Sequence, residues 1–322
     1  KGTDVRCVYV SIGQKKTSVL NAVETLKAGG VMNQTTVMVS SPDDPPALRY
    51  LAPYAGVTLA EFLLDKGMDV LIVYDDLSKH ADTYREMSLL LRRPPGREAY
   101  PGDIFYLHSR LLERACRLNE ERGGGSITAL PIATTQRGNI SSYIVTNLIS
   151  ITDGQIVLDA DEFNKGNKPA IDIGRSVSRV GSAAQEPAMK SVVKALKLEL
   201  SQYEEVARFA RFGTEVNEAT RKQIERGQRL NALLQQGPNR PVRFEDQVVQ
   251  FYALTNGFMD EVKPEKVAAF TKDMIGYLHN HAAQGMDAIK HDRCLSEETK
   301  ADIDQALGEF LELWDKKVKQ NK

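Results

Sequence analysis

Apolar and polar positions alternate along the first part of the chain in a pattern typical of an α/β domain. Short β-branched and apolar runs, one of them almost continuously hydrophobic, are separated by segments with helical spacing of apolar residues. The predicted strands are residues 5–12, 35–39 and 70–74, and the predicted helices are residues 17–28 and 46–64. Pro53 is expected to interrupt the second helix, because proline lacks a backbone N–H. Strands alternating with helices predict a doubly wound sheet.

The pattern changes from Gly123 onward. Residues 126–135 and 148–158 are predicted strands, and a segment rich in glycine and serine follows at 174–184. Beyond it, apolar residues recur every three or four positions, which predicts helices. These predicted helices cover residues 189–210, 244–258, 264–279 and 296–319. We therefore place a domain boundary near Ser182, with an α/β domain at 1–182 and an all-α domain at 183–322.

Composition and charge exclude several classes of function. The chain has 42 Lys and Arg against 43 Asp and Glu, so it lacks the basic excess expected of a protein that wraps nucleic acid. The cysteines lie far apart in the sequence, which argues against a disulfide framework or a zinc site and favours a reducing compartment. His279 and His281 form no metal-ligand pattern. No apolar run approaches the ~20 residues that span a bilayer. A function at a membrane would therefore depend on partner proteins.

Polar residues follow two of the predicted strands, at the edge where ligands of such sheets bind. Gln14 follows the first strand, and Asp75-Asp76 follow the third. Four hydrophobic residues before Asp75 have the form of a Walker B element, whose aspartate holds magnesium directly or through water. The alternative is an aspartate that only caps the next helix. The phosphate-binding pattern Gly-x-x-x-x-Gly-Lys-Ser/Thr is absent from the sequence.

Three further segments carry candidate residues. Three arginines between Arg92 and Arg97 surround a proline turn, and predict either a surface loop paired with Glu98 and Asp103 or a subunit contact or anion site. Arg179 lies between small residues, where it is either solvated or able to project onto a phosphate. The turns at Lys168-Pro169 and at Gln235-Gln236 have no specific interpretation by themselves.

Several longer segments carry a family resemblance. They are Asp75-Asp76-Leu77-Ser78-Lys79, the run from Ser88 to Arg114, residues 149–156 and residues 176–185. In these segments, and over residues 8–234 in general, the sequence resembles the alpha subunits of rotary F-type ATP synthases. The Asp-Asp-Leu-Ser-Lys segment and the Ser-Ile-Gly-Gln-Lys segment favour alpha over the related beta subunits.

The resemblance implies a RecA-like, mostly parallel sheet with helices on both faces, followed by an all-α C-terminal helical domain. It also implies that an N-terminal β-barrel and the phosphate loop lie upstream of Lys1. The chain opens almost directly on a predicted core strand, which agrees with a piece of a longer product. The implied partners are beta subunits in an alternating three-plus-three ring, the central gamma stalk, the peripheral stalk and the missing N-terminal part of alpha.

The resemblance also implies roles for single residues. Gln14 would stand where the beta subunit has its catalytic glutamate, so the alpha site would bind ATP or ADP without turning it over. Asp75 would be the magnesium-side aspartate, and Arg179 would reach into the neighbouring beta site as an arginine finger. Lys168-Pro169 and Gln236 would lie near the adenine. Lysine replaces the usual arginine there, and Pro238 breaks the family's glutamine pair.

Two alternatives stay open. The first is a related hexameric RNA translocase, which would need a basic, aromatic-lined path for RNA. The balanced charge of the chain argues against such a path. A structural fragment without its own nucleotide could only shape the ring and contribute Arg179. For the leading interpretation we expect contact with the membrane only through the membrane sector, and no nucleic acid. The preferred location is the matrix side of the mitochondrial inner membrane, with a plastid thylakoid or bacterial plasma membrane as the alternative.

Overall fold

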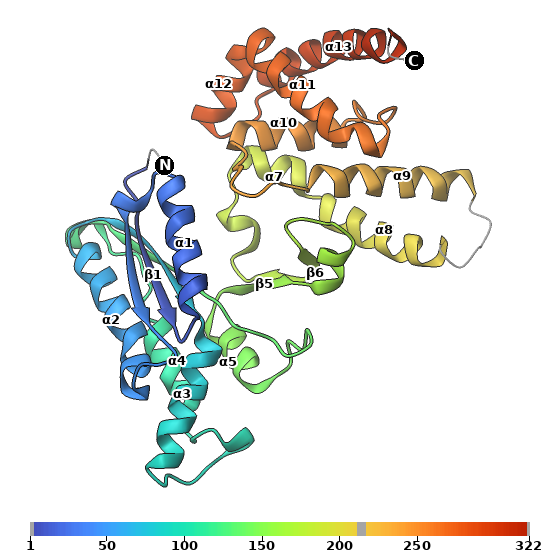
Figure 1. Cartoon of the computed structure of the whole chain (residues 1–322). Coiled ribbons are helices and arrows are strands. Elements are labelled where there is room, and N and C mark those ends of the chain that lie inside the picture. Colours follow the sequence, from blue (N-terminus) through green and yellow to red (C-terminus); the bar gives the residue numbers. More distant parts are fainter. Residues whose placement is uncertain (1–2, 211–216, 321–322) are drawn as a thin grey trace. The chain divides into compact units, whose positions relative to one another are not determined.

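The computed structural model describes residues 3–210 and 217–320. It divides into two compact units, Lys1–Gln155 and Ile156–Lys322, which we describe one at a time (Figure 1).

The first unit is built on a parallel four-stranded sheet. Its strands are β1 Arg6–Ile12, β2 Thr35–Ser40, β3 Asp69–Asp75 and β4 Ser126–Pro131, in the order β2-β1-β3-β4. Every neighbouring pair in this sheet is parallel. The register sets Ser11 beside Asp75, so the carboxyl ends of β1 and β3 coincide. The predicted parallel α/β fold is confirmed.

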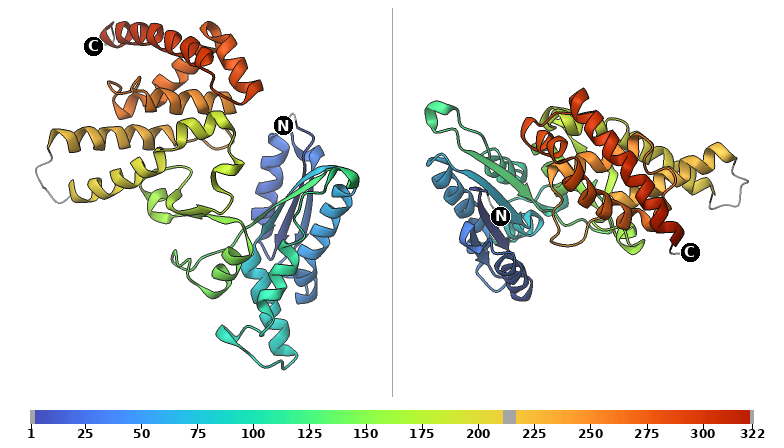
Figure 2. Two further views of the ribbon diagram at one scale, coloured as in Figure 1. Left: turned by 180° about the vertical axis from the view of Figure 1, so that it is seen from behind. Right: turned by 90° about the horizontal axis from the view of Figure 1, so that it is seen from above.

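Helices cover both faces of this sheet (Figures 1 and 2). The helices of this unit are α1 Lys16–Ala28, α2 Pro46–Leu64, α3 Leu77–Leu90, α4 Ile104–Leu112 and α5 Tyr143–Ile151, of which α4 and α5 pack mainly against other helices. In the sheet, β2 lies on one side of β1 and β3 lies on the other, so the β1–β2 and β2–β3 connections run in opposite directions across the sheet. Because such crossovers are right-handed, α1 and α2 lie on opposite faces.

Strand alternation explains which face holds the core. Val8, Val10 and Ile12 of β1 pack with Ile72 and Tyr74 of β3, and all are at most 1% exposed. Helix α2 covers this face, and the buried faces of α3 and α4 extend the same core. The intervening strand residues point to the other face of the sheet.

Several predictions of secondary structure are wrong in detail. Helix α2 continues through Pro53, which is buried. Proline has a helical φ angle, and burial of the flanking turns offsets the one hydrogen bond that it removes. Residues 148–151 belong to α5, and only Gly154–Leu158 forms a strand, β5. The apolar residues of that region allowed either structure, but Ile144, Val145 and Leu148 have helical spacing and are buried together.

Two histidines are completely buried within the first unit. The rings of His80 on α3 and His108 on α4 lie 5.4 Å apart between centroids. His80 Nε2 lies 3.0 Å from the carbonyl oxygen of Tyr50, whereas neither ring nitrogen of His108 has a hydrogen-bond partner among the described residues. Burial lowers the pKa of His80 to about 4 and that of His108 to about 3. Both rings are therefore neutral near pH 7.

We expect this pair to make the first unit sensitive to acid. Since the folded pKa values lie below the ordinary value of 6.5, the unfolded chain binds more protons between pH 6.5 and about 4. The free energy of unfolding should thus be highest above pH 6.5 and fall as the pH drops, by roughly 1.4 kcal/mol per unit of pKa difference. Urea unfolding at pH 7 and pH 5 measures this loss. His108→Phe should reduce it, whereas the exposed control His291→Gln should not; equal losses in both variants would contradict the account.

The second unit is mainly helical, as predicted. It contains β6 Ile171–Ser178, which pairs with β5, and the helices α6 Ala160–Asn164, α7 Pro187–Val193, α8 Leu196–Ala210, α9 Glu218–Leu233, α10 Phe244–Thr255, α11 Val267–His281, α12 Ala283–Asp292 and α13 Glu297–Gln320. Short 3-10 helices occur in the second unit at Gly181–Ala184 and Pro264–Lys266, and in the first unit at Met32–Gln34, Arg97–Ala99 and Glu120–Arg122. Val248, Phe270, Met274 and Leu278 are fully buried in its helical core.

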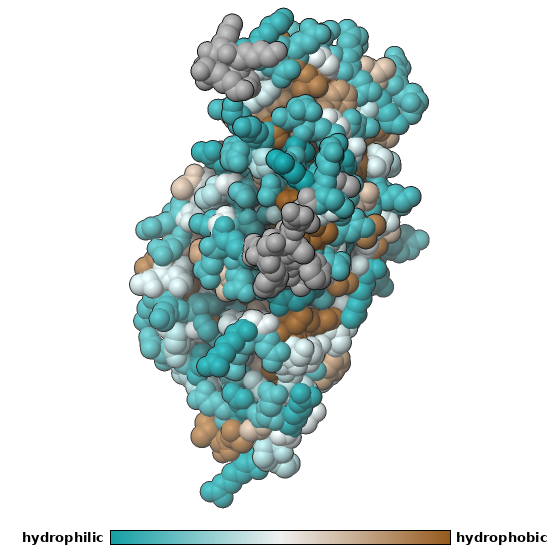
Figure 3. Space-filling model, turned by 90° about the vertical axis from the view of Figure 1, so that its right-hand side faces the viewer, coloured by the Kyte–Doolittle hydropathy of each residue, from teal (hydrophilic) through white to brown (hydrophobic). Residues whose placement is uncertain are grey.

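Polar residues dominate the surface that Figure 3 displays, with hydrophobic residues in small separate groups. Within the described residues, no helix is long and apolar enough to cross a membrane.

Candidate functional site

A polar network occupies the carboxyl edge of the parallel sheet. Its centre is Asp75, the last residue of β3. The Tyr9 hydroxyl donates a 2.5 Å hydrogen bond to Asp75 Oδ2, and Gln14 Nε2 donates a 2.5 Å hydrogen bond to Asp75 Oδ1. Parallel pairing of β1 with β3 brings the three side chains together, because Tyr9 and Asp75 point to the same face. Gln14 and Asp75, which the sequence places after two strands at this edge, are thus in direct contact.

Lys79 extends this network from the first turn of α3. Its Nζ donates a 2.6 Å hydrogen bond to Gln14 Oε1. The Gln14 amide is thus held at both ends, with its oxygen toward a cation and its nitrogen toward a carboxylate. In this orientation the Gln14 side chain presents no basic group that could accept a proton from water.

The two adjacent aspartates have different functions in the fold. Asp76 is 2% exposed and caps α3, with Oδ1 accepting from the Lys79 backbone N–H at 2.7 Å. Its Oδ2 accepts from the Thr134 hydroxyl at 2.8 Å. The helix-capping alternative therefore applies to Asp76. Asp75 caps no helix, which leaves its carboxylate for ligand chemistry.

Asp75 fits a magnesium site to which the protein contributes a single carboxylate. Each of its oxygens accepts one hydrogen bond and keeps a second lone pair. The described residues contain no group of three or more carboxylate, imidazole or thiolate side chains that could enclose a metal ion. Such a single carboxylate suits Mg²⁺ held largely by phosphate oxygens and water. Burial, and then the Asp75 carboxylate, raise the pKa of Tyr9, so its hydroxyl remains a donor.

The second unit brings together another set of predicted residues. The Gln236 backbone N–H donates a 2.8 Å hydrogen bond to the Lys168 carbonyl oxygen, and Gln236 Nε2 donates to the Arg240 carbonyl oxygen at 2.8 Å. Lys168 Nζ lies 4.9 Å from the centroid of the Phe163 ring, which is 57% exposed. Pro169 follows directly. An exposed aromatic ring beside a cation and an amide can receive a planar, polar ligand.

Arg179 lies immediately after β6 and is mainly exposed. The preceding Ser178 hydroxyl accepts a 3.0 Å hydrogen bond from the Gly181 N–H and closes the turn. Arg179 belongs to the second unit, whereas Gln14 and Asp75 belong to the first.

The arginine-rich loop after α3 has the ion pairs that the surface-loop interpretation predicts. Arg93 Nη2 lies 2.9 Å from Asp103 Oδ2, and Arg97 Nε lies 3.7 Å from Glu98 Oε1.

Sequence reasoning missed three members of the site, namely Tyr9, Lys79 and Thr134. Tyr9 is an inner residue of a strand, and only the register of β1 against β3 reveals its contact with Asp75. Lys79 was part of a recognised segment, and its spacing from Asp75 could have suggested a position near the strand end.

A parallel α/β sheet with polar groups at its carboxyl edge is the arrangement that many nucleotide-binding domains share. Comparison with protein families agrees with this assignment. Residues 1–178 match the nucleotide-binding domain of the ATP synthase alpha/beta family, and residues 185–310 match the C-terminal domain of the ATP synthase alpha/beta chain. The chain therefore belongs to the ATP synthase alpha/beta family.

Curated relatives are named ATP synthase subunit alpha. The protein from Aquifex aeolicus is 52% identical over 310 residues, covering 96% of this chain and 62% of the relative. That from Syntrophomonas wolfei is 51% identical over 308 residues, covering 95% and 61%. That from Clostridium botulinum is 50% identical over 314 residues, covering 98% and 62%. The chain thus spans about six tenths of the length of these relatives. All three are bacterial and give no support to the mitochondrial location preferred above.

Proposed function

We propose that this chain acts as a non-catalytic, nucleotide-binding alpha subunit of a proton-translocating F-type ATP synthase. The observation that carries the proposal is the position of Gln14, whose amide is fixed between Lys79 and Asp75. A general base at this position would need a carboxylate or imidazole able to take a proton from the attacking water. An amide cannot do so, and the site would keep its nucleotide intact.

The binding residues follow from the same geometry. Asp75 would hold Mg²⁺ through water, and the cofactor would be ATP or ADP with its phosphates at the sheet edge. Lys168, Pro169 and Gln236 would contact the adenine. Lys168 stacks less well than arginine, so contact with the base would depend more on Phe163. The proposed functional boundary between the two domains lies near Ser182, between the segments that match the two family models, whereas the two compact units divide after Gln155.

The catalytic contribution of the chain would be made at a neighbouring beta subunit. Arg179 is the proposed arginine finger, since it is exposed on a short turn of small residues that lets a partner approach. A guanidinium there would stabilise charge on the transferring phosphoryl group. Beta subunits, the central gamma stalk and the peripheral stalk are the proposed partners. The complex would sit on the surface of an energy-coupling membrane.

Co-purification tests this assembly. The full-length subunit that contains this chain should form a stable hetero-oligomer with beta subunits, because in the proposed ring each nucleotide lies at an interface that the two subunits share. Light scattering on the purified mixture measures its mass. Retention of RNA at low salt would favour the translocase alternative, and an assembled subunit without bound nucleotide would favour the structural fragment. Failure of the wild-type subunit to associate with beta would refute the proposal.

A further inference from the structure

Lys79 places an ammonium group at the carboxyl edge of the sheet without a carboxylate partner. It lies in the first turn of α3 and is partly buried. Among the side chains that the structure describes, no carboxylate lies within ion-pair distance of Lys79 Nζ, and its hydrogen-bond acceptor is the neutral amide oxygen of Gln14. Removing an ammonium group from water costs free energy unless other polar groups replace its hydration. Lys79 is therefore a cation that a bound anion would stabilise.

The course of the Lys79 side chain follows from the geometry of α3. Side chains of an α-helix lean toward its N-terminus, and α3 begins two residues after β3 ends. The aliphatic stem passes close to Gly13, the residue after β1, where an added Cβ would lie 3.6 Å from Lys79 Cδ. The ammonium group is thus held beside the turn that follows β1, at the same edge of the sheet as Asp75.

A single amide group separates Lys79 from Asp75. Gln14 Oε1 accepts from Lys79 Nζ at 2.6 Å, and Gln14 Nε2 donates to Asp75 Oδ1 at 2.5 Å. A direct ion pair would neutralise the lysine and the aspartate together, whereas the bridging amide orients both groups and keeps their charges apart. An ammonium group has three N–H donors, and the contact with Gln14 needs one of them. Lys79 can therefore keep this contact while it binds a ligand.

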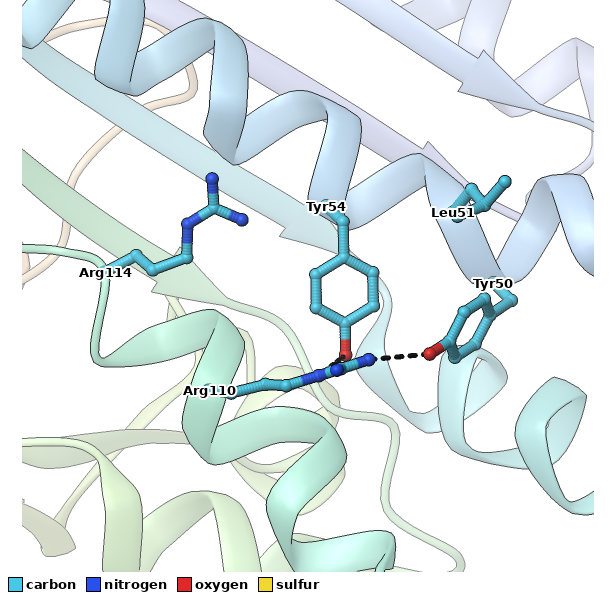
Figure 4. Close-up of a pocket in the computed structure, with 5 residues that line it drawn as sticks. All are labelled: Tyr50, Leu51, Tyr54, Arg110 and Arg114. Atoms are coloured by element: carbon cyan, nitrogen blue, oxygen red, sulfur yellow. Dashed lines mark hydrogen bonds between the residues drawn. The ribbon is translucent and has the colours of Figure 1, made fainter.

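Two arginines of the same unit show how a cation is satisfied within the fold. In the hollow of Figure 4, Arg110 donates to the hydroxyl groups of Tyr50 and Tyr54. Arg114 makes a bidentate pair with a carboxylate of α2. Each of these arginines joins the segment around α4 to α2 through two hydrogen bonds or more. Lys79 differs from both, because one neutral oxygen leaves its charge available for a ligand.

We propose that Lys79 binds the phosphate chain of the nucleotide beyond the α-phosphate, and that Gln14 positions Lys79 for this contact. A magnesium ion bound to a nucleotide bridges its β- and γ-phosphate oxygens. Since Asp75 is the proposed partner of that ion, a cation one amide away from Asp75 is placed to reach the same two phosphate groups. The hydrogen bonds from ammonium to phosphate are charge-assisted and strong. This inference rests on the proposed function and adds one binding residue and one positioning residue to its site.

A comparison of ATP with AMP tests the binding role in the full-length subunit. Lys79→Met keeps the stem over Gly13 and removes the charge. It should lower the affinity for ATP, titrated without Mg²⁺, by about tenfold or more, the loss expected for a charge-assisted hydrogen bond. The affinity for AMP should stay nearly unchanged. Lys79→Gln should show the same selective loss, Lys79→Arg should retain most of the ATP affinity, and the exposed control Lys27→Met on α1 should bind both nucleotides as the wild type does.

Two results would overturn the role of Lys79 and leave the proposed function standing. One is wild-type affinity for ATP in both Lys79→Met and Lys79→Gln. The other is an equal loss of affinity for ATP and AMP, which indicates general damage to the site. Failure of the wild-type subunit to bind ATP even with Mg²⁺ is a different outcome, since it refutes the proposed function itself.

A double-mutant cycle tests the positioning role of Gln14. Gln14→Leu should lower the affinity for ATP less than Lys79→Met does, again without Mg²⁺. Because Gln14 is proposed to act through Lys79, adding Gln14→Leu to Lys79→Met should cause almost no further loss. Urea unfolding of the three variants checks that their folds are retained. Fully additive losses would show that Gln14 acts on the nucleotide independently, and would overturn its positioning role.

Discussion

Turnover of the assembled complex is expected to fall by ~10³-fold or more when Arg179 is replaced by alanine, the range measured for arginine fingers. The reason is electrostatic. A guanidinium positioned where negative charge develops on the phosphoryl group stabilises the transition state more than the bound substrate. Arg179 lies on an exposed turn, so truncation should leave the fold and the assembly intact. Steady-state ATP hydrolysis by the purified hetero-oligomer measures the effect.

The control for this prediction is another exposed arginine of the same chain. Arg122 lies in the short helix Glu120–Arg122 and is mainly exposed. Arg122→Ala removes the same side chain from a place without a proposed function, and should retain turnover. A comparable loss in both variants would indicate a general effect on assembly, and near-normal turnover of Arg179→Ala would rule out the arginine finger.

The second large effect is expected at the chain's own nucleotide site. Asp75→Ala should abolish most of the Mg²⁺-dependent increase in nucleotide affinity of the isolated full-length subunit. The substitution removes the carboxylate proposed to hold Mg²⁺, which also accepts the hydrogen bonds of Tyr9 and Gln14. We expect a loss of at least about tenfold, as for other groups that orient a bound metal. Titration with ATP, with and without Mg²⁺, measures this difference.

A carboxylate at the other end of the same strand provides the control. Asp69 begins β3 and accepts a hydrogen bond from the Ser126 hydroxyl, far along the strand from Asp75. Asp69→Ala should therefore leave the Mg²⁺ dependence of binding unchanged. An Asp75→Ala subunit that retained the full Mg²⁺ effect would contradict the assignment of Asp75.

The sequence predicted the α/β fold because hydrophobic periodicity is strong in its strands. Every second residue from Val70 to Tyr74 is buried in the core, and an aspartate lies at each end of the run. The errors lie where local pattern is ambiguous. Residues 148–151 are apolar enough for either a strand or a helix, and their packing decided for α5. Pro53 stays helical for the same reason, since tertiary burial outweighs local preference.

Prediction of the site was less complete for a different physical reason. Asp75 and Gln14 follow strands, so their place at the sheet edge could be predicted. The contacts of Tyr9 and Lys79 depend on register and on the path of α3, which no local pattern specifies. Similarly, only the fold reveals that Asp76 caps a helix while Asp75 does not. The roles of Lys168 and Gln236 came from resemblance alone.

Rapid-quench analysis of the Arg179→Ala complex tests the central claim most directly, because it separates nucleotide binding from cleavage. We predict that the mutant complex binds ATP at its catalytic sites with an affinity within a few-fold of the wild type, while the first-order rate of cleavage of bound ATP falls by ~10³-fold or more. Cleavage of bound ATP at the wild-type rate would contradict the claim that this chain contributes Arg179 to catalysis in a neighbouring subunit.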